Sequence, residues 1–431
     1  MKRIRVGLLG FGTVGAGVFH ALRSQEEIIL RRTGAVFDIR SILVQNAAKE
    51  RPAEVKPLIT TDFRRVLKEE IQVVVEAIGG IEPARTYVEQ AIEAGCHIVT
   101  ANKELVAKHG VELERMARRN GVHFFYEASV GGGIPVLGTL IHFLKSNRIH
   151  RVSGILNGTT NYILTRMAEE AAPFEQVLEE ARQKGYAEAD PSADVDGFDA
   201  VYKLVILGRL AFEADISVSD VQREGIRDVT AVELAMARRL GYTVKLLAVG
   251  EQYGENGPIS LGVEPALLPL PHPLASVNGV YNAIHLEGDM VQDVTLVGQG
   301  AGEQPTSSAV VEDLCNLSLL PSPMRSLKTE PLILPAAETG GRRFVCLETR
   351  EHGVPEAKTL KSRLESIGLS VEETTVSPEG GAAFILRRWD PSYPSVLVAE
   401  LGLDLARISV RRVFGTEAAA KNRSPEVGTA V

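Results

Sequence analysis

Gly10-Phe11-Gly12-Thr13-Val14-Gly15 lies between an apolar run, Ile4–Leu9, and a helical pattern, Val14–Leu22. A strand that passes through such a G-x-G-x-x-G loop into a helix is typical of dinucleotide binding, because the helix N-terminus presents amide donors to the pyrophosphate. We assign the tight turn to Gly10, the close approach of the pyrophosphate to Gly12, and close helix–strand packing to Gly15. A glycine turn with a purely structural role is the less favoured interpretation.

Outward from this loop, apolar runs alternate with helical patterns through the first third of the chain. We expect strands at Val73–Ala77, Ile98–Ala101 and Val122–Tyr126, and helices at Pro83–Ala94 and Glu104–Asn120. Strands that alternate with helices form parallel sheets covered by helices. The pattern therefore predicts an α/β fold in which residues 1–133 form a doubly wound, Rossmann-type domain. A returning helix within residues 303–320, at Glu303–Leu319, is expected to complete that domain.

Residues 134–302 are expected to form a second domain, of α+β type. Its helical patterns lie at Val136–Lys145, Phe174–Lys184 and Phe198–Ala211, and its extended segments at His150–Leu156, Val244–Tyr253 and Met290–Val297. Prolines then cluster within residues 321–342, at positions Pro321, Pro323, Pro331 and Pro335. Such clustering without periodicity is typical of a linker.

Residues 343–416 have the element order strand, helix, strand, strand, helix, strand. The expected bounds are Phe344–Thr349, Val354–Ile367, Ser370–Thr375, Ala382–Arg388, Ser392–Leu403 and Ile408–Val413. This order is the split βαβ pattern of ferredoxin-like domains. Residues 417–431 are small and polar, and we expect them to form a flexible tail.

The composition disfavours several classes of protein. Of 431 residues, 45% are apolar and 24% are charged, as in ordinary soluble proteins, and the net charge of −8 disfavours nucleic acid and anionic lipid as partners. No apolar run reaches the length of a membrane span. Cys96, Cys315 and Cys346 are too far apart to indicate a disulfide framework or a zinc site. We therefore expect a cytoplasmic protein with no nucleic-acid or membrane partner.

The residues after the second expected strand bear on which dinucleotide is bound. Val44-Gln45-Asn46 offers no carboxylate for the ribose 2′-hydroxyl of NAD, whereas Lys49 and Arg51 could meet the 2′-phosphate of NADP. Both could equally be solvated loop charges. The cofactor is expected to be NADP or NAD, with NADP favoured.

The helix over Phe198–Ala211 carries an unusual charged pair. Asp199 and Lys203 are four residues apart and share one face, and the rest of the helix is largely apolar. A helix that is apolar all round is normally buried, and desolvation would lower the pKa of Lys203 while Asp199 opposes that shift. The alternative is an ordinary surface pair.

Further motifs follow in a fixed order. They are Thr100-Ala101-Asn102-Lys103, Glu127-Ala128-Ser129-Val130-Gly131-Gly132-Gly133-Ile134-Pro135, Leu156-Asn157-Gly158-Thr159-Thr160-Asn161-Tyr162, Gly185-Tyr186-Ala187-Glu188-Ala189-Asp190-Pro191, Asp194-Val195-Asp196-Gly197-Phe198-Asp199 with Lys203, and Gly298-Gln299-Gly300-Ala301-Gly302 with Pro305-Thr306. Together with the glycine loop, this series resembles homoserine dehydrogenase across the first 320 residues.

The resemblance implies a reversible NAD(P)-dependent reduction of L-aspartate 4-semialdehyde to L-homoserine, a step in threonine, methionine and isoleucine biosynthesis. It implies that Lys203 is the acid/base, that Asp199 and Glu188 hold the substrate ammonium and hydroxyl, and that Lys103 and Gly300 line the nicotinamide side. The chemistry suits these residue types, because an ammonium can stabilise and protonate the oxygen on which hydride transfer develops negative charge.

The full implied site is larger. The catalytic residues are Lys203, Asp199 and Lys103, the substrate-binding residues are Glu188, Asp199 and Gly185, and the cofactor-binding residues are Gly10, Phe11, Gly12, Thr13, Val14, Gly15, Thr100, Lys103 and Gly300. The resemblance also implies a sodium ion held mostly by backbone carbonyls at Glu127, Val130, Gly132 and Ile134. Residues 134–302 would then provide the substrate site and the dimerisation surface of a homodimer or homotetramer.

The C-terminal unit, 343–416, resembles an ACT domain, the ferredoxin-like module that often binds amino acids. Its entry loop departs from the usual Asp-Pro-Gly pattern, because Glu351-His352-Gly353-Val354-Pro355 stands there. We therefore expect the unit to assemble the oligomer and threonine to inhibit weakly or not at all, which a threonine series on homoserine oxidation would test. The alternative is that the unit is only a dimerisation or stabilising appendage.

Two alternatives remain open at this point. One is an amino-acid-sensing protein whose working part is the C-terminal unit, and the other is a different two-domain NAD(P) oxidoreductase. A fused aspartate kinase is not expected, because the chain begins at the first strand. Turnover of aspartate semialdehyde with NADPH would separate the enzyme from the sensor.

Overall fold

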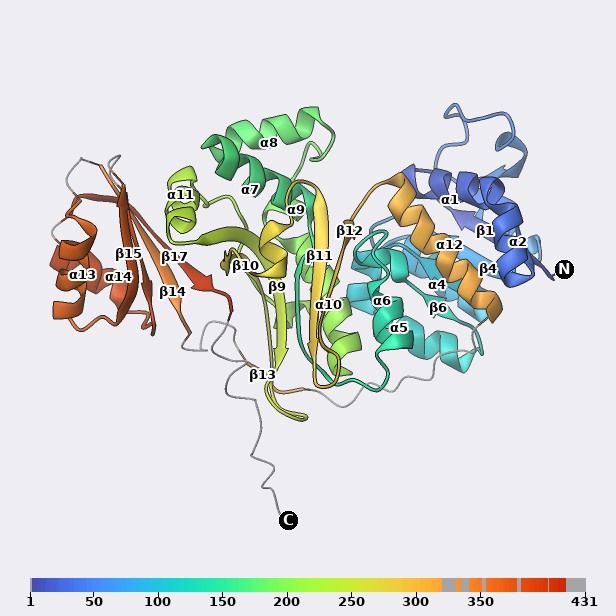
Figure 1. Ribbon diagram of the computed structural model, residues 1–431. Helices are drawn as coiled ribbons and strands as arrows, with labels where there is room; N and C mark the ends of the chain where they lie inside the picture. Colours follow the sequence, from blue (N-terminus) through green and yellow to red (C-terminus); the bar gives the residue numbers. More distant parts are fainter. Residues whose placement is uncertain are drawn as a thin grey trace, which may run out of the picture.

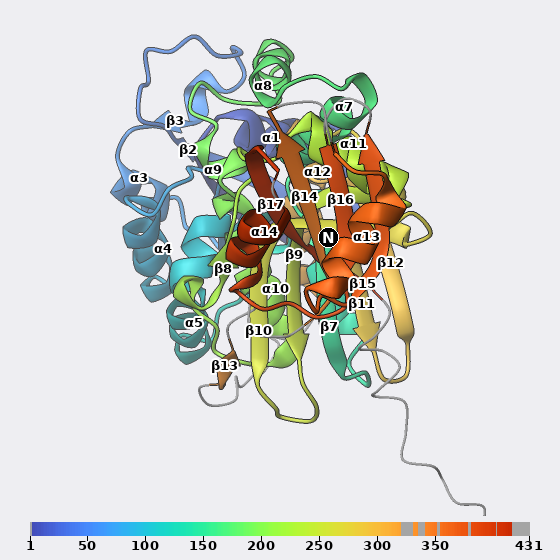
Figure 2. The same ribbon diagram turned by 90° about the vertical axis from the view of Figure 1, so that its left-hand side faces the viewer.

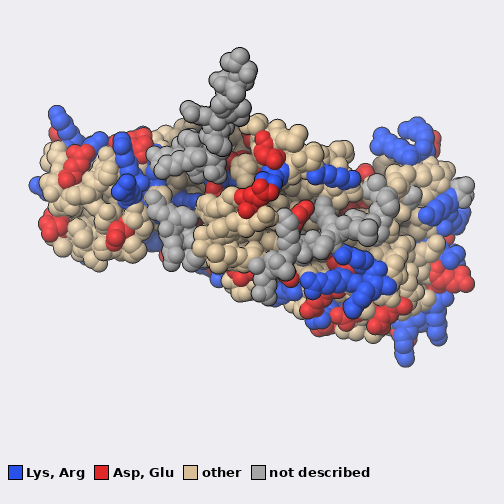
Figure 3. Space-filling view, turned by 90° about the horizontal axis from the view of Figure 1, so that it is seen from below, with Lys and Arg blue, Asp and Glu red and all other residues tan. Residues whose placement is uncertain are grey.

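The computed structural model describes residues 2–319, 331–334, 341–350, 354–377, 381–401 and 403–415. The chain folds into three parts arranged in a row, with the first third of the sequence at one end and the C-terminal unit at the other (Figure 1). Among the described residues, no helix has both the length and the apolar character that crossing a bilayer requires. Acidic and basic side chains are intermixed over the face shown in Figure 3.

The first part is a parallel six-stranded sheet with the strand order β3-β2-β1-β4-β5-β6. Its strands are β1 (Lys2–Leu9), β2 (Ala35–Leu43), β3 (Ile59–Thr60), β4 (Val73–Glu76), β5 (His97–Thr100) and β6 (Phe124–Phe125). The connecting helices are α1 (Thr13–Ser24), α2 (Glu26–Thr33), α3 (Phe63–Lys68), α4 (Ala84–Glu93) and α5 (Lys103–Arg119). This order confirms the predicted Rossmann-type sheet, whose ligand site lies where the order reverses.

The returning helix α12 (Glu303–Leu319) packs against α1, as predicted. The contact depends on Gly17, because a Cβ there would lie 2.7 Å from Glu303 Cγ. Gly17, the second glycine of α1, thus lets the two helices approach closely, a role that the glycine-loop motif did not predict.

The middle part is built on antiparallel strands that join distant segments. They are β7 (Ile149–Ile155), β9 (Tyr242–Gln252), β10 (Ile259–Pro269), β11 (Tyr281–Gly288) and β12 (Gln292–Gln299). Helices α7 (Gly158–Glu170), α8 (Phe174–Gln183), α10 (Phe198–Phe212) and α11 (Ala231–Arg239) accompany them, with the short elements α9 (Ser192–Val195) and β8 (Gln222–Arg223). Buried residues of α7, α10 and one set of strand residues form the main core, and other buried residues of β7, β9, β10 and β11 form a second, smaller cluster.

The expected helix over Val136–Lys145 forms, but it is shorter and only partly an α-helix. Its α-helical part is the short α6 (Val136–Gly138), which continues as a π-helical turn over Thr139–Phe143. The Thr139 hydroxyl donates to the Pro135 carbonyl at 2.6 Å, and back-bonding of this kind distorts a helix. The turn closes when the Leu144 N–H donates to the Thr139 carbonyl.

The C-terminal unit contains the six predicted elements in the predicted order. They are β14 (Arg343–Thr349), α13 (Ala357–Ser366), β15 (Val371–Ser377), β16 (Gly381–Leu386), α14 (Tyr393–Leu401) and β17 (Leu405–Val413). The strand order β17-β14-β16-β15, antiparallel throughout, is the ferredoxin-like arrangement. Helices α13 and α14 cover its outer face (Figure 2), and α11 packs on the other.

The C-terminal sheet is continuous with that of the middle part, which the sequence did not predict. Strand β17 pairs in parallel with β10 at Ala266 and Leu267, so that the two sheets form one of 11 strands. Within the predicted linker 321–342, Ile333–Leu334 forms the short strand β13, which also pairs with β10. The rest of the linker, apart from residues 331–332 and 341–342, lies outside the described residues, as do the loop 351–353 and the predicted tail 417–431.

Candidate active site

The glycine loop has the geometry that a bound diphosphate needs. Gly10 has a φ of +98°, and a Cβ there would lie 2.6 Å from the Ala77 carbonyl oxygen. Gly12 is the N-cap of α1, no side chain of the described residues caps it, and a Cβ there would meet nothing within 4 Å. A Cβ at Gly15 would overlap the Gly10 carbonyl, so that this glycine permits the turn itself more than strand packing. The loop therefore leaves open space in front of the helix amides, where a pyrophosphate fits.

Buried hydrogen bonds hold the ends of β4 and β5 together beside this loop. The Glu76 carboxylate is fully buried and accepts from the Thr100 hydroxyl at 2.5 Å and from the Ile78 N–H at 2.8 Å. Burial raises the pKa of Glu76. Asn102 caps α5 through the Leu105 N–H and donates to the Gly80 carbonyl at 2.6 Å. Thr100 thus turns its side chain inward, and Glu76 and Asn102 are organising residues that the sequence analysis missed.

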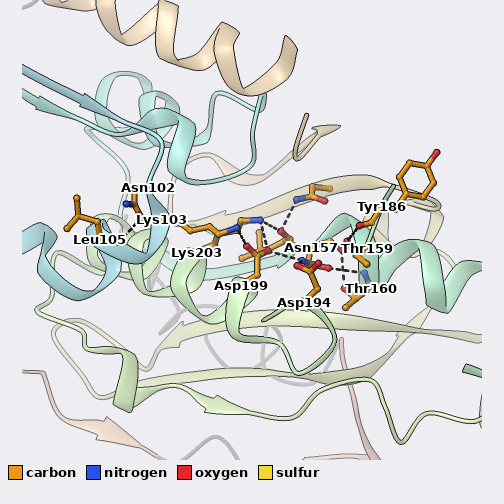
Figure 4. A network of polar contacts seen from close by, with 12 residues as sticks. Asn102, Lys103, Leu105, Asn157, Thr159, Thr160, Tyr186, Asp194, Asp199 and Lys203 are labelled. Carbon is orange, nitrogen blue, oxygen red and sulfur yellow. Dashed lines mark hydrogen bonds and ion pairs between the residues drawn. The ribbon is translucent and has the colours of Figure 1, made fainter. Parts of the chain in front are cut away.

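Lys203 lies at the centre of a buried ionic cluster (Figure 4). Its Nζ donates to Asp199 Oδ2 at 2.7 Å and to the Leu156 carbonyl at 2.6 Å. Lys103, at the start of α5, forms a close ion pair with the other oxygen of Asp199. The side chains of Asp199 and Lys203 are only 3% and 8% exposed, which is inconsistent with a surface pair. The Lys103–Asp199 ion pair also joins the first and middle parts of the molecule.

The charges in this cluster shift one another's protonation equilibria. Burial lowers the pKa of Lys203, and the attraction of Asp199 opposes that shift, in the direction predicted. Burial alone would raise the pKa of Asp199, but attraction to Lys203 and Lys103 holds it well below its usual range. Asp199 in turn raises the pKa of Lys103. The arrangement holds one permanently charged carboxylate against a lysine that loses its proton more readily than an exposed one.

Asn157 and Asp194 extend the cluster, and no pattern in the sequence indicated a role for either. The Asn157 amide donates to Asp199 Oδ2 at 2.9 Å and to Asp194 Oδ1 at 2.7 Å, and its oxygen caps α7 through the Thr160 N–H. Asn157 follows β7, whereas Asp194 lies in α9. We call Lys203, Lys103, Asp199, Asp194 and Asn157 the Lys203 cluster.

The remaining predicted substrate residues lie on an exposed turn beside the cluster. Gly185 has a φ of +74°, and the next residue, Tyr186, accepts at its carbonyl from the Thr159 hydroxyl at 2.7 Å. Glu188 is exposed, and its negative charge contributes to the raised pKa of Lys103. The structure thus places a carboxylate near Lys103 that is free to face a ligand.

Gly300 reaches the same site from the end of β12. A Cβ at Gly300 would overlap the side-chain amide of Asn282. That amide donates to the Leu156 carbonyl at 2.8 Å, the acceptor that it shares with Lys203. Only glycine therefore permits this approach, and Asn282 is a further buried residue that the sequence analysis missed.

The predicted sodium loop is tightly turned. Gly131 and Gly132 have φ values of +74° and +56°, and a Cβ at Gly132 would lie 2.6 Å from the Gly300 backbone. The Glu127 carboxylate accepts from the Leu137 and Gly138 N–H groups, and burial raises its pKa to about 7. The described residues contain no group of three or more His, Cys, Asp or Glu side chains placed to hold a metal ion.

Comparisons with known proteins agree with one another. The family model "Homoserine dehydrogenase, NAD binding domain" matches residues 10–127, and the model "Homoserine dehydrogenase" matches residues 135–315. The chain is 43% identical over 316 residues to the homoserine dehydrogenase of Bacillus subtilis, across 73% of this chain and 72% of that protein.

Solved structures of two proteins are also similar. A homoserine dehydrogenase from Thiobacillus denitrificans has a TM-score of 0.84 at 35% identity and covers 96% of this chain and 99% of its own. A hyperthermophilic archaeal homoserine dehydrogenase in complex with NADPH has a TM-score of 0.62 at 27% identity, over 76% of this chain and 100% of its own.

Proposed function

Since this chain belongs to the homoserine dehydrogenase family, we propose that its Lys203 cluster interconverts L-homoserine and L-aspartate 4-semialdehyde. The chain is an NAD(P)-dependent oxidoreductase that acts on a CH–OH group. The observation that carries the assignment of the site is the buried Lys203 Nζ, 2.7 Å from Asp199 and with a lowered pKa. The sensor and the other oxidoreductase are not favoured.

The proposed chemistry divides between the cofactor and the chain. When bound, the nicotinamide supplies a hydride to the aldehyde carbon or accepts one from the alcohol carbon. Protonated Lys203 donates the proton that the new alkoxide oxygen takes up, and neutral Lys203 removes it in the reverse direction. Asp199 keeps the ammonium group of Lys203 oriented through a 2.7 Å hydrogen bond. The Cys96 thiol is buried and its pKa is raised to about 11, so it is not suited to attack the aldehyde as a nucleophile and form a thiohemiacetal.

The overall activity has a direct test. Purified protein should reduce NADP⁺ in step with homoserine oxidation, and it should do so with no added partner. NADP⁺ reduction that does not depend on homoserine would contradict the proposed function.

The substrate ammonium is proposed to bind between Glu188 and the carboxylates of the Lys203 cluster. Glu188→Gln should raise the KM for homoserine about tenfold or more, because a charge-assisted hydrogen bond contributes about 1.5–3 kcal/mol. The dissociation constant of the cofactor should stay unchanged. Steady-state rates and a cofactor titration measure both. Glu179→Gln, an exposed carboxylate on α8, is the matched control, and an unaltered KM in Glu188→Gln would exclude the assignment.

We propose NADP as the preferred cofactor, with NAD tolerated. Arg51 donates to the backbone carbonyls of Asn46 and Lys49 at 2.9 and 3.0 Å, which folds a cationic loop over the end of β2. Gln45 and Asn46 supply no carboxylate there. The archaeal relative solved with NADPH supports the same choice.

This preference predicts the effect of Arg51→Ala. The variant should lower kcat/KM for NADP by about tenfold, since one phosphate contact of 1–2 kcal/mol is lost, and should leave kcat/KM for NAD within about twofold. Arg31→Ala, on α2, is the control. A wild-type enzyme that prefers NAD would refute the proposal.

We also propose a sodium ion at the backbone carbonyls of Glu127, Val130, Gly132 and Ile134. Two consecutive left-handed glycines redirect carbonyls within this loop, which supports a site built from backbone oxygens. The bound ion would brace the loop against Gly300 at the nicotinamide side. Initial rates should therefore rise with sodium, and identical rates in sodium and tetramethylammonium salts would argue against the ion.

We propose that the enzyme is cytoplasmic and oligomeric. The buried free thiols suit the reducing cytoplasm. Tyr281 and Val297, on β11 and β12, are 46% and 56% exposed and leave an apolar edge that a second copy could cover. We propose a homodimer or homotetramer, and light scattering that gives a monomer mass would contradict this.

A further inference from the structure

Segment 222–230 runs between the C-terminal unit and the Lys203 cluster. It contains β8 and the loop that leads into α11, and β8 pairs in parallel with β10 at Gly262 and Val263. Neither the glycine loop nor the proposed substrate residues include it. The segment contacts both the C-terminal unit and the residues next to the Lys203 cluster, through side chains and backbone. The position of one can therefore affect the position of the other.

On its inner side the segment holds the chain between two cluster carboxylates, Asp194 and Asp199. The Arg227 guanidinium donates to both oxygens of Asp196, at 2.5 and 3.2 Å. The Ile226 N–H donates to the Val195 carbonyl at 2.8 Å, and a Cβ at Gly225 would overlap that carbonyl.

Arg223 adds a third contact on the same side. It donates to the Asp196 carbonyl, and its guanidinium lies 3.7 Å from the centre of the Phe198 ring. Residues 195–198, which lie between Asp194 and Asp199 in the sequence, are therefore held in place by segment 222–230.

On its outer side the same segment is held by the C-terminal unit. Arg407, on β17, donates to the carbonyl and the carboxylate of Asp228 at 2.7 and 3.0 Å. Arg411, also on β17 and 5% exposed, pairs with Glu233 at 2.7 Å and with Glu224. The Thr230 hydroxyl donates to Glu348 on β14 at 2.7 Å.

We propose that Arg407 and Arg227 are positioning residues through which the C-terminal unit holds Asp194 in its substrate-binding geometry beside Asp199. The inference rests on the proposed function for the identity of the substrate. Arg407 fixes segment 222–230 from outside, and Arg227 passes that constraint to Asp196. The C-terminal unit is thus part of the substrate-binding structure, and not only an appendage.

The inner contact is tested by Arg227→Ala. We expect the KM for homoserine to rise about tenfold while kcat and the dissociation constant of NADP change by less than about twofold. Asp194, on the short α9, shifts away from the substrate, whereas the Lys203–Asp199 hydrogen bond lies within α10 and stays in place. Arg182→Ala, a half-buried arginine of α8 in the same part of the molecule, is the control. Arg227 is 43% exposed, so the variant should fold.

The outer contact is tested by Arg407→Ala against Arg350→Ala. Arg350 pairs with Asp404 inside the C-terminal unit and does not contact segment 222–230 by any described hydrogen bond. Arg407→Ala should raise the KM for homoserine several-fold, and Arg350→Ala should leave it unchanged. The double variant Arg227→Ala/Arg407→Ala should have no higher KM than Arg227→Ala alone, since both changes break one path.

Two results would overturn the inference. One is a wild-type KM in Arg227→Ala, and the other is an effect of Arg407→Ala that multiplies fully with that of Arg227→Ala. Homoserine turnover by the wild-type protein tests the proposed function separately, so that failure of one is distinguishable from failure of the other.

Discussion

Lys203→Met should reduce the turnover of homoserine by about a thousandfold, within the range of about 10²–10⁴ that general acid–base groups contribute. Methionine keeps the length and the apolar stem of the side chain but cannot exchange a proton. The dissociation constant of the cofactor should change by less than about twofold, because Lys203 lies on α10 and is not part of the glycine loop at the start of α1. Steady-state rates and a cofactor titration give the two quantities.

Lys245 provides a matched control for that variant. It is also a buried lysine, but its Nζ donates to Asn161, Asn278 and the Val277 carbonyl and contacts no carboxylate by a described hydrogen bond. Lys245→Met should lose stability and keep its turnover, because buried acceptors lose their donor. If Lys203→Met retained a tenth of wild-type kcat, a barrier change of only about 1.4 kcal/mol, Lys203 would not be the acid/base.

Asp199→Asn should reduce kcat about a hundredfold and shift its pH dependence to lower pH. The rate should fall because Lys203 and Lys103 lose their shared counter-charge, an electrostatic loss of about 2.7–4 kcal/mol at comparable sites. The sign of the pH shift follows from the causes of the Lys203 pKa. Burial lowers that pKa and Asp199 raises it, so removing the carboxylate lowers it further.

The pH dependence of kcat depends on the direction of the reaction. Homoserine oxidation needs neutral Lys203, so its kcat rises as the pH passes upward through the pKa of that lysine. In Asp199→Asn this rise should begin at lower pH than in the wild type. A pH series of kcat measures it, with Asp404→Asn, an exposed carboxylate of the C-terminal unit, as control. A midpoint that stays in place or moves upward would contradict the role of Asp199.

Most elements of the first and last parts could be predicted because their signals are local. The glycine loop, the alternation of strands and helices and the six C-terminal elements all follow from residues close together in sequence. Strands β10 and β11 were missed in the middle part. Pro265 lies inside β10 and argues against a central strand, yet it falls between the residues that pair with β8 and those that pair with β17. The missing N–H therefore costs no hydrogen bond on that side.

The candidate site also contains residues that the sequence predicted and residues that it did not. Asp199 and Lys203 were predicted from the sequence because they are one helical turn apart, and Lys103, Glu188 and Gly300 entered only through the resemblance. Asn157, Asp194, Asn282 and Glu76 were assigned no role, because their partners lie far away along the chain. Asn157, for example, meets Asp199 across 42 residues, and Asn282 meets the Leu156 carbonyl across 126.

The sequence by itself determined the dinucleotide loop, the order of the elements in the first and last parts, and the buried Asp199–Lys203 pair, because each depends on the periodicity and chemistry of neighbouring residues. The tertiary structure decided that Lys103 pairs with Asp199 and that β17 joins β10. It also decided that segment 222–230 connects the C-terminal unit to the Lys203 cluster. These contacts join residues that local patterns treat independently, and packing alone determines which of them meet.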